Sequence, residues 1–104
     1  MLRIYPVALS VTADAARIAE TINRQDSDLA RQLRRAATSV ALNIAEGSYS
    51  QGKNRRARYF NALGSARETL ACIEVAAAAQ FATQDPEVTL RLNHIIGTLV
   101  RLTR

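Results

Sequence analysis

Basic side chains gather in one part of the sequence. Residues 29–60 contain seven basic residues and one acidic residue, a net charge of +6, whereas the whole chain of 104 residues carries +5. Arginine outnumbers lysine 13 to 1, and the forked guanidinium group binds phosphate better than an ammonium group does. A polyanionic partner is therefore one expectation. The candidate nucleic-acid-binding residues are Arg31, Arg34, Arg35, Lys53, Arg55, Arg56 and Arg58.

The same charges have a plainer interpretation, and the sequence leaves both open. A run of charged residues is commonly a solvated helix face, or it forms salt bridges between subunits. Two tyrosines, Tyr49 and Tyr59, lie among the basic residues, and such side chains stack on unpaired bases. No motif for reading a DNA groove is present, so we expect any binding to depend on phosphate contacts and to tolerate changes of nucleotide sequence.

The residues that could perform catalysis do not form a constellation. His94 has no carboxylate one helical turn away, and only two residues separate it from Arg91. That spacing is too short for the Arg–His motif of small helical ribonucleases. Cys72 lies between apolar neighbours and is expected in the core. One Cys and one His give no zinc pattern, so we expect no enzyme activity, no metal site and no cofactor.

Polar residues interrupt two apolar helix faces. Asn43 and Glu46 lie on one predicted helix, and Ser65 and Glu68 lie at an equivalent depth on the next. Buried carboxylates need partners, so we expect a structural network that fixes the register of the two helices. A paired-carboxylate metal site would require Glu-x-x-His signatures, which neither Glu has. The candidate partners of the carboxylates are Asn43, Ser65, Arg35 and Arg67.

Four helices are needed to carry these residues. We expect the first to begin near Pro6 and to end at residue 23 or 24, and the second to run from a cap at Asp26 or Ser27 to Gly47. Apolar residues at helical spacing predict a third helix over residues 63–81. We assign the basic residues after position 52 to the link between the second and third helices and to the start of the third helix. Asp85 and the proline after it predict the start of the fourth helix.

The composition supports the same architecture. The chain has 48% hydrophobic residues, mostly small or aliphatic, with only 4 Gly and 2 Pro, which argues against a β-sandwich and favours closely packed helices. No apolar run approaches the ~20 residues that span a membrane, and no signal sequence is evident, so we expect a cytoplasmic protein without membrane contact. The predicted fold is all-α, a single antiparallel up-down-up-down four-helix bundle over residues 1–104.

Two motifs resemble a known bacterial family. Segment 31–47 ends in Asn43-Ile44-Ala45-Glu46-Gly47, and a Gly-Ser-x-x-Glu element follows at residues 64–68. Both resemble signatures of the four-helix bundle family that includes proteins encoded in intervening sequences of ribosomal RNA genes and the accessory variability determinants of diversity-generating retroelements. The signature residues, which the resemblance implies to be structural, are Asn43, Glu46, Gly47, Ser65 and Glu68.

The resemblance implies a ring-like homopentamer with a basic surface. In the retroelement members that surface engages nucleic acid, RNA or DNA, and a partner reverse transcriptase; the intervening-sequence members have no established role. One departure from the family lies at Gln80-Phe81, where a helix-ending glycine is expected. The functional hypothesis is a non-enzymatic, oligomeric accessory protein that binds nucleic acid and a reverse transcriptase or ribonucleoprotein partner. The alternative is a purely structural interaction module with no nucleic-acid ligand.

Overall fold

Four helices joined by short connections make up the described part of the chain. The computed structural model describes residues 2–104, and over that range it contains helices and no strands. The helices are α1 (Ile4–Ile22), α2 (Ser27–Ser48), α3 (Gly52–Ala78) and α4 (Pro86–Thr103).

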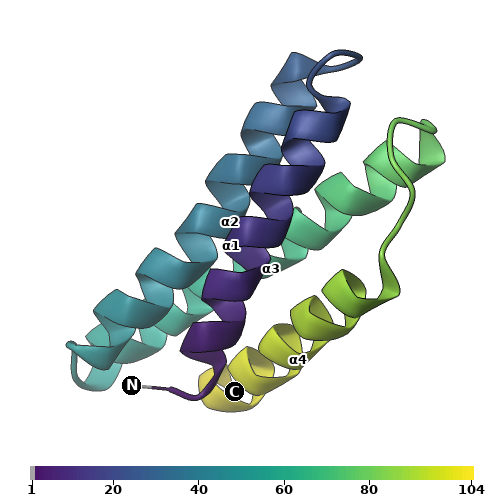
Figure 1. Ribbon diagram of the computed structural model, residues 1–104. Coiled ribbons are helices and arrows are strands. Elements are labelled where there is room, and N and C mark those ends of the chain that lie inside the picture. Colours follow the sequence, from purple (N-terminus) through teal and green to yellow (C-terminus); the bar gives the residue numbers. More distant parts are fainter. Residues whose placement is uncertain (1) are drawn as a thin grey trace.

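Each helix packs against its two neighbours in the bundle. The contacting pairs are α1 with α2, α2 with α3, α3 with α4, and α1 with α4, in a molecule measuring 43 × 22 × 20 Å. Both chain ends and the α2–α3 connection lie at one end of the bundle, and the other two connections lie apart at the opposite end (Figure 1). This is the predicted all-α, up-down-up-down architecture.

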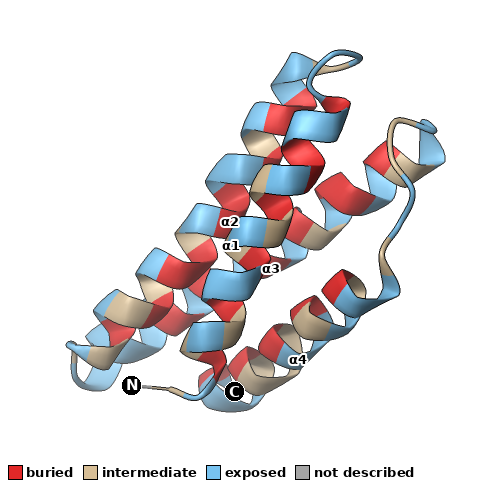
Figure 2. Cartoon of the chain, viewed as in Figure 1, coloured by how far each residue is buried: buried red, intermediate tan, exposed pale blue. Residues whose placement is uncertain are grey.

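The core follows the apolar spacing of the sequence. The buried positions face inward and the exposed ones outward along every helix (Figure 2). Alanines such as Ala8, Ala37 and Ala62 are fully buried and alternate with larger side chains such as Leu33 and Leu92. Because alanine has no side chain beyond Cβ, the helices approach closely, which is how a chain with few aromatic residues fills its core.

Local capping chemistry fixes two helix starts as the sequence predicts. The Asp26 carboxylate accepts a hydrogen bond from the Leu29 amide at 2.9 Å, and the Asp85 carboxylate accepts one from the Glu87 amide at 2.9 Å. Each carboxylate satisfies an amide that has no partner inside the helix, and its negative charge suits the positive end of the helix dipole. Pro86 occupies the start of α4.

Four predicted helix boundaries differ from those of the structure. α1 begins at Ile4, so Pro6 lies inside the first turn, where an amide has no helical partner and proline costs little. α2 continues past Gly47 to Ser48. α3 begins at Gly52, so residues 53–58 are helical and belong to no link, and it ends at Ala78 instead of Phe81.

The backbone at the end of α3 shows how this helix ends without the glycine expected at Gln80-Phe81. Gln80 has a φ of 64°, in the left-handed region that glycine usually occupies at this position. The Phe81 amide donates to the Ala76 carbonyl at 2.8 Å, and the Gln80 amide donates to the Ala77 carbonyl at 3.0 Å. These two bonds form a Schellman motif, and the Phe81 ring packs against the core. The helix therefore ends in the usual Schellman geometry. The backbone of Gln80 is strained because its side chain disfavours a positive φ.

Gln80→Gly is expected to stabilise the protein. Glycine removes the left-handed penalty, which is about 1–2 kcal/mol for other residues, at some entropic cost. We expect a net gain of about 1 kcal/mol and a melting temperature higher by ~4–8 °C, measured by thermal circular dichroism. Ala79→Gly is the control, because Ala79 has a φ of −79° and gains nothing from glycine. Equal shifts for the two variants would contradict the strain at Gln80.

Candidate nucleic-acid interface

The α2–α3 hairpin sets the positions of all the candidate residues. Arg58 Nη1 lies 2.9 Å from Glu46 Oε2, and Ser65 Oγ donates to Ser39 Oγ at 2.8 Å. Both pairs fit one register of antiparallel helices, as the sequence predicts. In this register the level of Asn43 matches that of Asn61.

The basic residues form two groups at different levels. Arg31, Arg34 and Arg35, the α2 arginines, lie on the first half of α2, whereas the α3 basic cluster, Lys53, Arg55, Arg56 and Arg58, lies in the first turns of α3. In the hairpin register, Arg35 is level with Thr69, eleven residues beyond Arg58. At 1.5 Å per residue the two groups are about 16 Å apart along the bundle. The structure therefore does not bring the seven residues into one compact patch.

Two arginines of the α3 basic cluster bind the ends of other helices. Arg55 Nε donates to the carbonyls of Gly47 and Ser50, at 3.1 and 2.9 Å. Arg56 donates from Nε to the Thr103 carbonyl at 3.0 Å, and from Nη2 to the same oxygen. A cation at a helix C-terminus is stabilising because the last carbonyls carry partial negative charge. Arg55 and Arg56 thus cap α2 and α4, a structural role that the sequence did not reveal.

The remaining basic residues differ in whether a carboxylate group neutralises their charge. Arg58 pairs with Glu46 and Arg31 pairs with Asp28, so each has a carboxylate partner. Lys53, Arg34 and Arg35 are exposed and make neither a hydrogen bond nor an ion pair within residues 2–104. The uncompensated positive charge of the candidate interface belongs to these three residues.

Of the two tyrosines that the sequence indicated, one is buried and one is exposed, and a further aromatic residue is exposed nearby. Tyr59 is 5% exposed and packs over Gly47, so the hypothesis that it stacks on bases is wrong. Tyr49 is 84% exposed at the end of α2. Phe60, which the sequence did not single out, is 61% exposed on α3. Its position four residues after Arg56 on one helix could have revealed it as a neighbour of the α3 basic cluster.

Phe60 lies among three adjoining depressions along α3. The first, of about 270 Å³, is lined by Lys53, Arg56, Ala57, Phe60 and Asn61. The second, of about 420 Å³, adjoins Ser50, Asn54, Ala57, Arg58 and Asn61. The third is an open hollow of about 710 Å³ lined by Ser39, Asn43, Arg58, Phe60, Asn61, Gly64, Ser65 and Glu68. Asn61 borders all three, so they form a continuous surface.

The polar network between α2 and α3 exists but excludes the carboxylates. Asn43 Nδ2 donates to the Ser39 carbonyl at 2.9 Å and to Ser39 Oγ at 3.0 Å, and Ser65 Oγ donates to Ser39 Oγ at 2.8 Å. Glu46 and Glu68 are exposed, so the expectation of buried carboxylates is wrong. Ser39, which no sequence motif indicated, is the centre of the network.

Gly47, a residue of the same signature, has a packing role. A Cβ built on Gly47 would lie 2.7 Å from Cδ1 of Tyr59 and closer still to Cε1. Only glycine leaves room for the buried ring, so this residue holds α2 and α3 in close contact.

The two catalytic candidates, Cys72 and His94, lie on different helices and differ in burial. Cys72 is buried, and burial together with the nearby charge of Glu68 raises the pKa of its thiol, which keeps the thiol protonated. His94 is exposed on α4. Within residues 2–104, no three His, Cys, Asp or Glu side chains are grouped to hold a metal ion.

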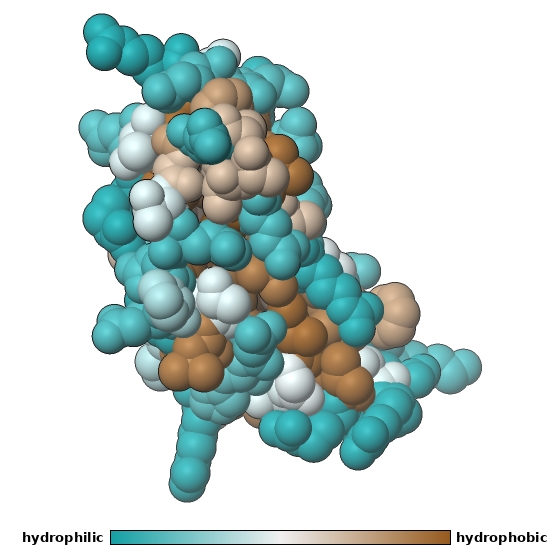
Figure 3. Space-filling model, turned by 90° about the vertical axis from the view of Figure 1, so that its right-hand side faces the viewer, coloured by the Kyte–Doolittle hydropathy of each residue, from teal (hydrophilic) through white to brown (hydrophobic). Residues whose placement is uncertain are grey.

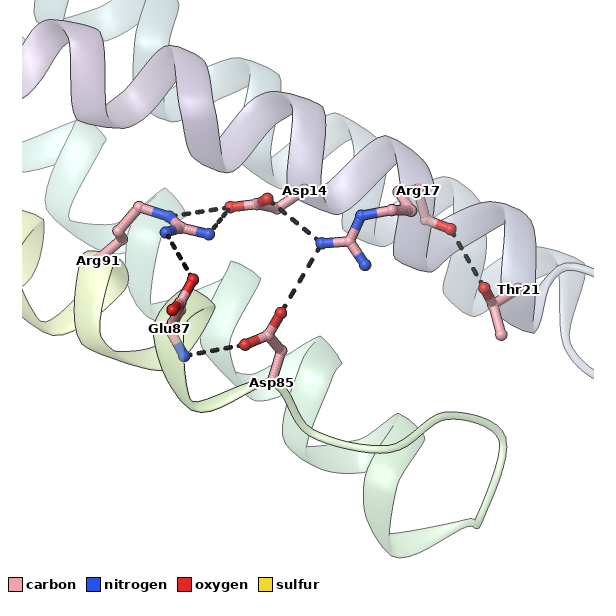
Figure 4. A network of polar contacts seen from close by, with 6 residues as sticks. All are labelled: Asp14, Arg17, Thr21, Asp85, Glu87 and Arg91. Atoms are coloured by element: carbon pink, nitrogen blue, oxygen red, sulfur yellow. Dashed lines mark hydrogen bonds and ion pairs between the residues drawn. The ribbon is translucent and has the colours of Figure 1, made fainter.

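A network of charged side chains joins α1 to α4 (Figure 4). Arg91 donates from Nε and Nη2 to Asp14 Oδ2, at 3.1 and 2.8 Å, and this hydrogen bonding raises the pKa of the guanidinium. Arg17 lies 3.3 Å from Asp14 and 4.0 Å from Asp85. The network connects the start of α4 to the middle of α1, so Arg91 is an interhelix partner.

Comparisons with known proteins agree with this fold. A solved structure from Bacteroides thetaiotaomicron VPI-5482, a protein with unknown function from the S23 ribosomal protein family, is similar with a TM-score of 0.87 and 17% identity; the similarity covers 97% of this chain and 98% of that one. No curated protein matches the chain. In the described range no helix is long and apolar enough to cross a membrane. The family model of the 23S rRNA-intervening sequence protein matches residues 1–100. The chain therefore belongs to the 23S rRNA-intervening sequence protein family.

Proposed function

We propose that this protein is a non-enzymatic accessory protein that binds the phosphate backbone of nucleic acid. The observation that carries the proposal is the uncompensated charge of Lys53, Arg34 and Arg35, which are exposed and have no carboxylate partner in the described chain. Exposed cations of this kind release counterions from a nucleic acid when they bind it. A family named for an intervening sequence of 23S rRNA supports RNA as the first polyanion to test.

The proposal includes self-association and a larger partner. The bundle exposes large apolar side chains on all four helices, including Leu42 on α2, 58% exposed, and Leu90 on α4, 70% exposed. Brown hydrophobic patches among hydrophilic side chains are visible on the face toward α4 (Figure 3). Such exposure supports a homo-oligomer, and the family resemblance suggests a pentamer with a reverse transcriptase or ribonucleoprotein as partner. A gene position inside an rRNA gene or beside a reverse transcriptase gene would separate these partners.

A purely structural role for the basic residues is the second candidate. Arg55 and Arg56 cap helices and Arg58 pairs with Glu46, so three of the four cations in the α3 basic cluster already have partners within the fold. Replacing these three residues would perturb the bundle itself. They are therefore unsuitable for testing nucleic-acid binding, and the test must use the cations that have no such partners.

The decisive test replaces basic residues that do not cap a helix. We expect the variant Arg34→Gln/Arg35→Gln/Lys53→Gln to bind a fluorescent single-stranded RNA more weakly than the wild type in anisotropy titrations. The slope of log affinity against log salt should become shallower by ~0.7 for each phosphate that the variant no longer binds. The control removes three charges elsewhere, in Arg3→Gln/Arg24→Gln/Arg101→Gln, and should keep most of the affinity. Wild-type protein that binds no RNA, or binds it without salt dependence, would contradict the proposal.

A further inference from the structure

We propose that Phe60 is a stacking platform for an unpaired base, which makes single-stranded nucleic acid the preferred ligand of this surface. The inference rests on the proposed function and adds the part of the nucleic acid that is recognised, an unpaired base. Phe60 is a large aromatic side chain, 61% exposed, on a well-formed helix of a small bundle. An exposed aromatic ring beside basic residues is the combination by which proteins hold single strands.

The groups around Phe60 suit one nucleotide. Lys53, Arg56 and Ala57 line the first depression together with Phe60 and Asn61. Ala57 and Gly64, three residues before and four residues after Phe60 on the helix, have no side chain beyond Cβ, and a Cβ built on Gly64 meets nothing within 4 Å. A flat base therefore has access to the ring from either direction along the helix.

The polar groups divide into a phosphate end and a base end. Lys53 has no carboxylate partner in the described chain, and Arg56 uses Nε and Nη2 on the Thr103 carbonyl but not Nη1. These two cations lie one to two helical turns before Phe60, about 6–10 Å along the axis. Asn61 follows the ring and offers an amide, which both donates and accepts hydrogen bonds, to the edge of a stacked base.

The acidic residues limit the extent of the site. Glu68 borders the third depression and makes no ion pair within residues 2–104, so its charge repels a phosphate there. Arg58, on the same hollow, is neutralised by Glu46 at 2.9 Å. The base that stacks on Phe60 is thereby expected to lie toward the Lys53-to-Asn61 end of α3, away from Glu68.

This geometry selects single strands over duplexes. In a duplex the base faces are already stacked on one another, so an exposed ring gains nothing from them without unstacking. Phosphate contacts are available in both forms. Stacking on Phe60 therefore adds affinity for unpaired strands alone, whereas Lys53 adds affinity for both.

The test compares one strand with its own duplex. The full chain is titrated with a fluorescent 12-nucleotide RNA, alone and annealed to its complement. Stacking contributes about 1–3 kcal/mol per base, or ~5–150-fold in affinity, so Phe60→Ala is expected to lose affinity for the single strand by that factor and to bind the duplex within twofold of the wild type. Phe60→Trp should restore single-strand binding. Lys53→Ala should weaken both forms alike.

Each other outcome has a distinct meaning. If wild-type protein binds neither form, the proposed function itself fails. If wild-type protein binds RNA but Phe60→Ala weakens both forms equally or neither, the stacking site is refuted while phosphate binding stands. If Phe60→Ala instead lowers the mass measured by sedimentation, Phe60 is a contact between copies of the chain, and the stacking proposal is overturned.

Discussion

Gly47→Ala is expected to lower the free energy of unfolding by about 2 kcal/mol, although alanine is the better helix former. Gly47 lies in the last turn of α2, so alanine alone would gain at most about 1 kcal/mol of helix propensity. The new Cβ, however, would overlap the buried ring of Tyr59, so the ring or the helix would have to shift. Overpacking of a core costs about 1–3 kcal/mol or more, and displacing the ring would expose its apolar surface. The clash outweighs the propensity gain.

Chemical denaturation of both glycine variants would measure this balance. Gly64→Ala makes the same chemical change inside α3, where a Cβ meets no atom within 4 Å, so it should raise stability by about 1 kcal/mol. The two variants should therefore shift the unfolding midpoint in opposite directions. Adding Tyr59→Leu to Gly47→Ala should recover part of the loss, because the smaller side chain leaves room for the methyl group. A stabilising Gly47→Ala would show that the Tyr59 ring does not depend on glycine.

Ser39→Ala is expected to lower the free energy of unfolding by about 1–2 kcal/mol. The substitution removes the oxygen that accepts from both Asn43 and Ser65 and leaves those two half-buried groups with one partner fewer. Each lost hydrogen bond costs about 1 kcal/mol, more where a buried group stays unsatisfied, and the gain in helix propensity offsets about 0.5 kcal/mol. Thermal melting should show a decrease of ~4–8 °C for each kcal/mol.

Two comparison variants separate the network from its surroundings. Ser10→Ala makes the same change on an exposed part of α1 and should have a small or stabilising effect. Glu46→Ala breaks only an exposed ion pair with Arg58, so the expected change is below about 1 kcal/mol. A melting temperature for Ser39→Ala equal to that of Ser10→Ala, or a larger loss for Glu46→Ala, would place the stabilising interaction elsewhere.

The number and order of the helices follow from short-range patterns. Apolar residues recur every three or four positions, and a capping Asp precedes both α2 and α4, so these features need no knowledge of the tertiary structure. The polar run after Gly47 was misleading. Its hydroxyl and glycine residues are typical of a long link, but the structure uses only residues 49–51 to connect α2 to α3.

The site residues were harder to predict because neighbouring positions on a helix point about 100° apart. Tyr59 and Phe60 are adjacent, and the ring that faces inward is the one with the hydroxyl, because Gly47 leaves a space for it. Glu46 lies three residues after Asn43 and turns away from the network to the solvent side. The contact of Arg91 with Asp14 spans 77 residues, and no local pattern predicts it.

The matched register of α2 and α3 has a consequence for how the length of this chain can vary. Ser39 pairs with Ser65 and Glu46 with Arg58, so equal numbers of residues separate the paired positions on both helices. A single inserted residue between Ser39 and Glu46 would rotate the rest of α2 by about 100° and carry Gly47 away from Tyr59. A single insertion or deletion within residues 39–46 or 58–65 is therefore expected to disrupt the hairpin, whereas the α1–α2 and α3–α4 connections, which lie at the opposite end of the bundle from the α2–α3 turn (Figure 1), are not under this constraint.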